Sequence, residues 1–252
     1  MKLDFFDVNT FIGRPMNGIF KPAKTGTDLV SEIRSHNISK AITWHILQYE
    51  CSPEKGNRTL VEEISGHPEL YGCWTILPPQ TGEIITKDFF RKMKENKIVA
   101  LNVFPEWHRF ILNRISFGEF LDELIERKIP LLLTMDRACL SWESLYGLMR
   151  EFPELTCILC DIGIWGVDRF TWPIIEKFPN FYLETSLLSL EEGGLEATVK
   201  RFGSERIVFG TGFPARYPKA AILQLACADI SDGDKEKIAS KNLEKILQEE
   251  KL

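Results

Sequence analysis

The stretch SFGEFLDELIERKIPLLLTM, residues 116–135, carries one helix and one strand of the predicted fold in chain order. Ser116 and Glu119 have the spacing of a capping box, in which a hydroxyl and a carboxylate bind amides in the first turn of a helix. Apolar side chains recur every three or four residues from Phe120 to Ile125, so that this helix has one apolar face. The apolar run at 129–135 has the length of a buried strand. The stretch therefore predicts a helix with an apolar face that lies on a sheet, followed by a buried strand.

The same alternation occurs eight times along residues 1–252, without a linker or a change in composition, which indicates a single domain. Strands are expected at 3–8, 39–45, 70–77, 97–104, 129–135, 155–161, 180–185 and 206–210. Eight strand–helix units in a chain of this length predict a (β/α)8 (TIM) barrel, because parallel strands require helical crossovers. A second capping box is expected at Ser189–Glu192. A further helix, from Ser231 to Gln248, is expected to pack across the bottom or the side of the barrel.

Composition excludes several classes of protein. The formal net charge is −5, which provides no broad basic surface for nucleic acid. Acidic residues interrupt the apolar start of the chain, and no later run has the ~18 apolar residues of a membrane helix. We therefore expect a cytoplasmic protein that binds neither nucleic acid nor membrane.

Six cysteines are too few to form a disulfide scaffold in a chain of 252 residues. Cys157 and Cys160 have the spacing of some zinc and redox motifs, but they lie in a strand-like run where residues three apart face opposite sides. No second Cys or His pair follows them. Reduced core thiols are the expected state.

In a TIM barrel, chemistry takes place at the C-terminal ends of the strands. The expected strand ends are Asp7–Gly13, Trp44–Ile46, Ile76–Pro79, Asn102–His108, Thr134–Arg137, Asp161–Trp165, Glu184–Ser186 and Gly210–Pro214. These eight stretches are predicted to line one pocket.

Several of these stretches resemble the amidohydrolase-related barrels. Residues 7–13, DVNTFIG, resemble the first strand of that superfamily, which typically reads Asp-x-His-x-His-x-Gly, and residues 206–214, RIVFGTGFP, resemble its Gly-Ser-Asp-x-Pro strand. Residues 160–163, CDIG, are similar to its sixth strand and residues 179–186, PNFYLETS, to its seventh. A final helix resembles 238–247, so the resemblance spans nearly the whole chain and implies the barrel fold and a hydrolase function.

The departures from the family pattern concern its metal site. Asn9 and Phe11 correspond to the two first-strand histidines of the family. Thr134 corresponds to its fifth-strand histidine, Asp161 to its sixth-strand histidine and Gly212 to its eighth-strand aspartate. Of these residues only Asp161 is a donor of the type that a catalytic zinc needs. Gly212 also replaces the family's proton shuttle. The resemblance therefore predicts that the metal site is lost and that no cofactor is bound.

Acid–base chemistry without a metal remains available. Strand alternation would turn Asp136 toward Asp161, and a carboxylate pair can divide acid and base roles. His45 has the best intrinsic pKa for moving protons. Arg137 or Arg216 would hold a carboxylate group of a substrate. A scaffold role is the alternative for each, such as a helix cap for Asp136, and Glu184 depends on a register that the sequence does not fix.

We predict Asp161 as a general base, with His45 or Asp136 assisting it. Aromatic residues at the strand ends suit a dry, partly closed pocket for a planar or sugar-like molecule. The predicted substrate-binding residues are Asn9, Phe11, Trp44, Phe104, His108, Thr134, Arg137, Trp165, Gly212, Phe213 and Arg216.

Two functions remain open from the sequence. The first is a metal-independent hydrolase acting on a lactone or a similar bond. The second is a non-catalytic descendant that binds a ligand or regulates an active relative. A third class, an interaction protein, would use Trp107 and Phe110 as an exposed patch, through which homo-oligomers are also conceivable.

Overall fold

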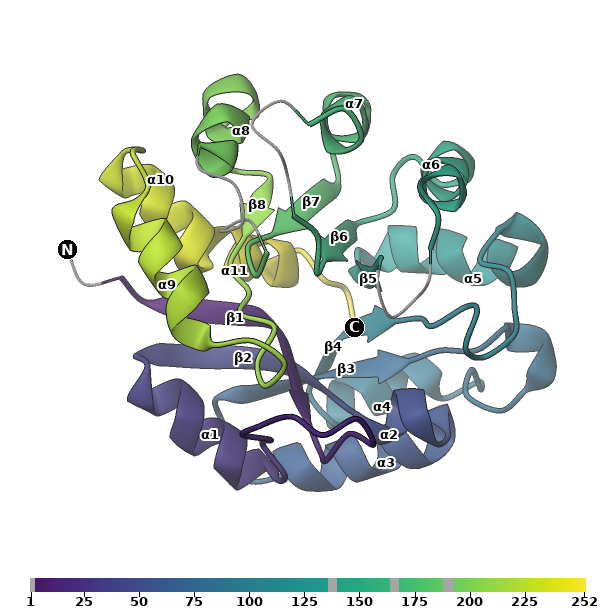
Figure 1. Cartoon of the computed structure of the whole chain (residues 1–252). Helices are drawn as coiled ribbons and strands as arrows, with labels where there is room; N and C mark the ends of the chain where they lie inside the picture. The colour runs from purple at the N-terminus through teal and green to yellow at the C-terminus, as the bar shows by residue number, and fades with distance from the viewer. Residues whose placement is uncertain (1–2, 136–139, 164–167, 188–192) are drawn as a thin grey trace.

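The chain folds into a (β/α)8 barrel, with the strands in the middle and the helices around them (Figure 1). The computed structural model describes residues 3–135, 140–163, 168–187 and 193–252. The strands are β1 (Phe5–Ile12), β2 (Ile38–His45), β3 (Leu70–Thr75), β4 (Ile98–Asn102), β5 (Leu131–Thr134), β6 (Cys157–Cys160), β7 (Phe181–Glu184) and β8 (Ile207–Val208). Each of the eight predicted strands is therefore confirmed.

All neighbouring strands are parallel and follow the sheet order β1 to β8. Backbone hydrogen bonds between β1 and the segment that continues β8 bring the two ends of the sheet together. The amide of Val8 donates to the carbonyl of Phe209 at 3.0 Å, and that of Gly212 donates to the carbonyl of Asn9 at 2.9 Å. The ends of β1 and β8 consequently lie side by side at the C-terminal face.

The crossovers between strands are helical, as parallel pairing requires. The helices are α1 (Gly26–Ser35), α2 (Leu47–Glu50), α3 (Pro53–Ile64), α4 (Phe89–Glu95), α5 (Arg114–Arg127), α6 (Trp142–Glu151), α7 (Thr171–Lys177), α8 (Gly194–Phe202), α9 (Pro218–Cys227), α10 (Asp232–Glu236) and α11 (Asn242–Gln248). A short 3₁₀ turn, Pro79–Thr81, follows β3.

Two apolar layers stabilise the barrel. The inner cluster contains side chains from strands around the ring, such as Val8, Ile42 and Ile158. The outer cluster lies between strands and helices and contains Cys157, whereas Cys160 belongs to the inner one. The two thiols thus face opposite sides of β6, as the spacing of three residues predicts.

The C-terminal helical segment covers the bottom of the barrel. It begins after Ser231, whose hydroxyl accepts a hydrogen bond from the amide of Asp234, and passes through a π-helical turn at Lys237–Lys241 into α11. Leu243 and Ile246 of α11 pack into the inner cluster. The predicted extra helix is confirmed, and it seals the N-terminal end of the strand ring.

The capping prediction for α5 is wrong by three residues. Asn113 is the N-cap, in extended conformation, and its side chain accepts a hydrogen bond from the amide of Ser116 at 3.0 Å. Asparagine is at least as good an N-cap as serine, so the helix begins at Arg114 and Ser116 lies in its first turn. Ser189–Glu192 lies outside the described residues, and the helix after it, α8, has Gly193 as its N-cap.

Candidate functional site

Asp161 lies directly after β6 at the C-terminal face, with a left-handed backbone at φ 59°. Its side chain is 1% exposed and forms an ion pair with the guanidinium of Arg216. The side-chain amide of Asn9, on β1, donates to Asp161 Oδ1 at 2.9 Å. These contacts bring together three predicted site residues from three separate parts of the barrel.

Glu184, the last residue of β7, is a second buried carboxyl group beside Asp161. Its Oε2 accepts hydrogen bonds from the backbone amide of Asp161 at 3.1 Å and from the Ser186 hydroxyl at 2.8 Å. Asn9 Nδ2 also lies 3.3 Å from this oxygen, so one amide group bridges both carboxyl groups. Burial, and then the charge of Asp161, raises the pKa of Glu184 to about 8. Glu184 is therefore mainly protonated at neutral pH.

Two glycines make room for this cluster. A Cβ atom on Gly210 would lie 2.2 Å from Glu184 Oε1, and a Cβ atom on Gly212 would lie 2.5 Å from Arg216 Nη1. Gly212 also has φ 67°, which favours glycine. The buried glutamate and the arginine can occupy their places because these two positions carry no side chain.

Asp7 is a third buried carboxyl group, one that the sequence did not single out. Its Oδ1 accepts hydrogen bonds from the amides of Asn9 and Thr211, each at 3.0 Å, and its Oδ2 accepts one from the Thr211 hydroxyl at 2.5 Å. Burial raises the pKa of Asp7 to about 7. Asp7 fixes the backbone of Asn9 against the segment after β8, and thereby supports the Asn9 bridge.

Aromatic rings line the neighbouring part of the mouth. The Trp44 ring lies 5.0 Å from that of Phe11 and 5.5 Å from that of Phe104, and Tyr49 stacks on Trp107 at 4.8 Å. A cavity of about 10 Å³ lies between this wall and the strand ends, and it is lined by Asn9, Trp44, Asn102, Val103, Phe104, Leu132, Thr134 and Cys160. That volume is about the minimum for one water molecule. The aromatic wall is thus closely packed around very little space.

The two histidines near the strand ends have separate surroundings. His45 Nδ1 accepts the amide of Leu47 at 3.1 Å, and its ring lies beside Gly13. Trp44 belongs to the inner cluster, so alternation directs His45 away from the interior. Burial lowers the pKa of His45 to about 4. The imidazole is therefore neutral at neutral pH, and these contacts give it no link to Asp161.

His108 packs edge-on against Phe104, with ring centroids 5.8 Å apart. Burial lowers the pKa of His108, and backbone groups of Tyr49 and Gln48 offset part of this effect. Among the described residues, no partner meets either ring nitrogen with hydrogen-bond geometry. His108 thus belongs to the aromatic wall.

The remaining predicted residues fall into two groups. Thr134 ends β5 and lines the small cavity, while Phe213 is buried and its carbonyl accepts the amide of Phe11 at 3.0 Å. Asp136, Arg137 and Trp165 lie outside the described residues. The exposed patch expected at Trp107 and Phe110 is divided: Trp107 is 51% exposed, whereas Phe110 packs against the outer core cluster.

Asp7, Glu184 and Ser186 lie in strand-end stretches that the sequence predicted to line the pocket, but none of them was among the predicted catalytic or binding residues. The available signal was the run Glu184–Ser186 at an expected strand end, combined with Gly210 on the next strand. Among the described residues, no group of three or more His, Cys, Asp or Glu side chains is arranged to hold a metal, and no helix there is long and apolar enough to cross a membrane.

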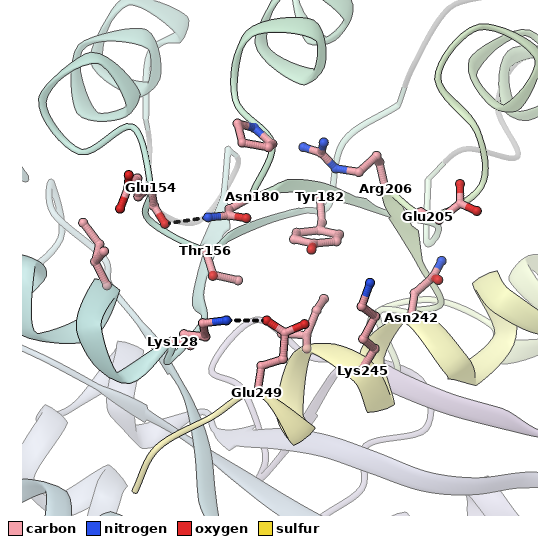
Figure 2. A pocket seen from close by; sticks show the side chains of 13 residues that line it. Lys128, Glu154, Thr156, Asn180, Tyr182, Glu205, Arg206, Asn242, Lys245 and Glu249 are labelled. Atoms are coloured by element: carbon pink, nitrogen blue, oxygen red, sulfur yellow. Dashed lines mark hydrogen bonds and ion pairs between the residues drawn. The ribbon is translucent and has the colours of Figure 1, made fainter.

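A larger pocket, of about 370 Å³, lies at the opposite, N-terminal face (Figure 2). The ends of α5 and α11 and the strand starts of β6 and β7 surround it. Lys128 forms an ion pair with Glu249 across this pocket at 2.7 Å, and both side chains are 46% exposed. The Arg206 guanidinium lies 5.3 Å from the Tyr182 ring and donates to the carbonyl of Phe181 at 3.0 Å. These charged side chains of the pocket are thus either exposed to solvent or bonded to the backbone.

Comparisons with known proteins agree with this architecture. The sequence profile of a family described as Amidohydrolase matches residues 45–248. No curated protein matches the sequence significantly. Among solved structures, a 2,6-dihydroxybenzoate decarboxylase from Rhizobium has a TM-score of 0.74 at 16% identity, covering 98% of this chain and 99% of its own.

Two further structures are similar over nearly their whole length. A dihydroxybenzoic acid decarboxylase from Polaromonas, with bound manganese and the inhibitor 2-nitroresorcinol, has a TM-score of 0.74 at 18% identity, covering 98% of this chain and 97% of its own. A probable 2-pyrone-4,6-dicarboxylic acid hydrolase from Acinetobacter baumannii, with citric acid bound, has a TM-score of 0.70 at 13% identity, covering 97% and 99%. At these identities the likeness establishes the fold.

Proposed function

We propose that this chain, which belongs to the amidohydrolase family, binds a small organic acid at the mouth of its barrel and hydrolyses a lactone-type bond without a metal ion. The observation that carries the proposal is the buried carboxyl pair Asp161–Glu184. One Asn9 amide bridges the pair, and Arg216 flanks it. A strongly shifted pKa beside a charged partner, at the catalytic end of a barrel, is typical of a functional site.

The donor chemistry supports a site without a metal. The family positions carry Asn9, Phe11, Thr134, Asp161 and Gly212. Neutral amide and hydroxyl oxygens bind divalent transition metals weakly, and Phe and Gly offer no side-chain donor. Asp161, the one anion among them, already pairs with Arg216 and Asn9. These residues do not fit a divalent ion such as the manganese of the Polaromonas enzyme.

The proposed chemistry divides roles between the two carboxyl groups. Asp161 takes a proton from a water molecule as that water attacks the acyl carbon of the substrate. The acyl C–O bond breaks, and the neutral Glu184 gives its proton to the departing alkoxide. A proton transfer from Asp161 back to Glu184 restores the starting state. The raised pKa of Glu184, about 8, suits this role as a proton store.

Arg216 and the aromatic wall support a planar, acidic ligand. The guanidinium has five N–H donors, and one of them bonds to Asp161. Its side chain is 23% exposed, so part of it is accessible to a ligand. Arginine forks bind carboxylates through two parallel hydrogen bonds. The dihydroxybenzoate and 2-pyrone-dicarboxylic acid named for similar structures belong to this ligand class.

The test is a panel of hydroxybenzoates, pyrone carboxylates and aryl lactones, with thermal shift for binding and mass spectrometry for product. We expect turnover in the wild type and a loss of about 10²- to 10⁴-fold in Asp161→Asn, the range for removal of a general base. Asp122→Asn, which changes a half-exposed aspartate on α5, is the matched control and keeps full activity. Wild-type turnover in Asp161→Asn refutes the proposed role.

A non-catalytic ligand-binding protein is the second candidate. The observation favouring it is the nearly complete burial of both carboxyl groups near a cavity that, among the described residues, measures about 10 Å³ and is itself too small for a substrate. Tight binders that yield no product throughout the panel would select this candidate. Product formation excludes it.

A further inference from the structure

The Asp161–Glu184 pair needs a positive charge beside it. The Asp161 side chain is 1% exposed, and Glu184 as a whole is fully buried. A buried carboxylate without a partner is strongly unfavourable, and it either pairs with a cation or takes up a proton. Glu184 avoids a buried negative charge by keeping its proton, because its pKa is raised. Asp161 stays charged and pairs with the guanidinium of Arg216.

Arg216 reaches Asp161 from the segment after β8, 55 residues further along the chain. Its backbone amide donates to the carbonyl of Gly212 at 3.2 Å, which forms a tight turn. This turn places the guanidinium over Gly212 and beside Asp161. The arginine is therefore positioned by local backbone structure as well as by its ion pair.

Gly212 is a structural requirement for that arrangement. A Cβ atom at this position would lie 2.5 Å from Arg216 Nη1 and 3.2 Å from Arg216 Cδ. By resemblance, position 212 is where the family has an aspartate, whose side chain would collide with the guanidinium. Gly212 and Arg216 thus depend on each other, because the arginine side chain fits only where position 212 lacks the aspartate of the family.

We infer that the guanidinium of Arg216, admitted by Gly212, is a built-in cation that takes the electrostatic place of the metal ion in metal-bearing relatives. It neutralises Asp161 and fixes its position, and its five N–H donors exceed the one that bonds to Asp161. The comparison of Arg216 with a metal ion rests on the proposed metal-free function. The ion pair and the space at Gly212 are independent of that function.

The experiment is chemical rescue of Arg216→Ala by guanidinium ion, measured by thermal unfolding at pH 7. We expect Tm to fall by about 6–20 °C, the range for a broken buried ion pair in a chain of this size. Low-millimolar guanidinium chloride, far below denaturing concentrations, should recover at least half of that loss. Arg91→Ala, which removes exposed ion pairs on α4, is the matched control and shows neither the loss nor the recovery.

A variant at Gly212 provides a second test of the same experiment. In Arg216→Ala/Gly212→Ala the added methyl group occupies the place of the guanidinium, so guanidinium ion should give no recovery. If Arg216→Ala does not fold, Asp161→Asn/Arg216→Ala tests the same pair, because removal of the anion should restore folding.

Failures of this inference and of the proposed function are distinguishable. An unchanged Tm in Arg216→Ala, or equal rescue in the double variant with Gly212→Ala, overturns the role of Arg216 while leaving metal-free function intact. If Arg216→Ala does not fold, continued failure of Asp161→Asn/Arg216→Ala also overturns it. Stoichiometric metal in the wild type that is lost in Asp161→Asn overturns both.

Discussion

The two ends of the barrel differ in the relation between space and charge. The N-terminal face has a pocket of about 370 Å³, whose ion pair Lys128–Glu249 is about half exposed. The C-terminal mouth has a cavity of about 10 Å³, but it buries Asp161 and Glu184 beside Arg216. Burial of charge has a high free-energy cost that needs a compensating role, whereas solvated surface charge has almost none. Burial of charge, and not pocket volume, therefore locates the candidate site.

After Arg216→Ala, the largest stability effect in this comparison is expected for Gly210→Ala at the mouth. Its Cβ atom would lie within 2.6 Å of three Glu184 atoms, so the glutamate must move or the strand must shift. Overpacking of this kind typically costs about 1–3 kcal/mol of unfolding free energy. Gly147→Ala, on α6 with nothing within 4 Å of the added Cβ, is the control and should stabilise the protein slightly. Denaturant titration measures both; equal stability of the two variants would show that Glu184 is not tightly enclosed.

The second prediction concerns the pH dependence of stability. The pKa of Glu184 is raised from 4.5 to about 8, so between these values the folded protein keeps a proton that the unfolded chain has lost. The stabilising contribution of this group is full below about pH 4.5 and is lost as pH rises toward 8. Glu184→Gln should flatten the decline in unfolding free energy over this range.

Asp7, whose pKa is also raised, is present in both the wild type and Glu184→Gln, so the difference between their pH curves reports Glu184 together with its coupling to Asp7. The comparison is made by denaturant titration at several pH values in one buffer series. Parallel curves for the wild type and Glu184→Gln would contradict a protonated Glu184.

The third prediction separates His45 from the proton chemistry of the mouth. Burial lowers the pKa of His45 from 6.5 to about 4, so the folded protein holds a neutral ring where the unfolded chain is protonated. Its contribution to stability is therefore present above pH 6.5 and is lost as pH falls toward 4. Titration of the ring Cε1–H signal by NMR, with His45→Gln to assign it, should give a midpoint near 4. A midpoint near 6.5 would restore His45 as a candidate proton carrier.

The smallest effect is expected at the N-terminal face. Lys128→Ala removes a half-exposed ion pair with Glu249, which should change the unfolding free energy by less than about 1 kcal/mol. Ligand binding and any turnover at the mouth should be unchanged. If Lys128→Ala abolished the binding of ligands found with the panel of acids, the larger pocket would be the functional one.

The sequence predicted the barrel because its signals are local. Each strand is a short apolar run, and the helix from Ser231 to Gln248 has its own cap and periodicity. The resemblance to the family pointed to Asn9, Asp161 and Gly212, and the structure brings Asn9 and Asp161 into hydrogen-bond contact.

The pairing within the site was harder to predict because it depends on register. β1 has an irregularity between Asp7 and Thr10 in its pairing with β2, which shifts the simple alternation at Asn9. The inward position of Glu184 likewise follows from the register of β7 with β6 and β8. Contacts such as Arg216 to Asp161 join residues far apart in the chain, and the role of Gly212 is evident only when the guanidinium lies above it.

The central claim is that this amidohydrolase-family barrel uses Arg216 in place of a metal ion at its mouth. Elemental analysis of the purified, never-chelated wild type and of Asp161→Asn, counting zinc, iron, manganese and nickel per chain, tests it most directly. Far less than one metal ion per chain is expected in both the wild type and Asp161→Asn. Close to one ion per chain in the wild type, and none in Asp161→Asn, would contradict it.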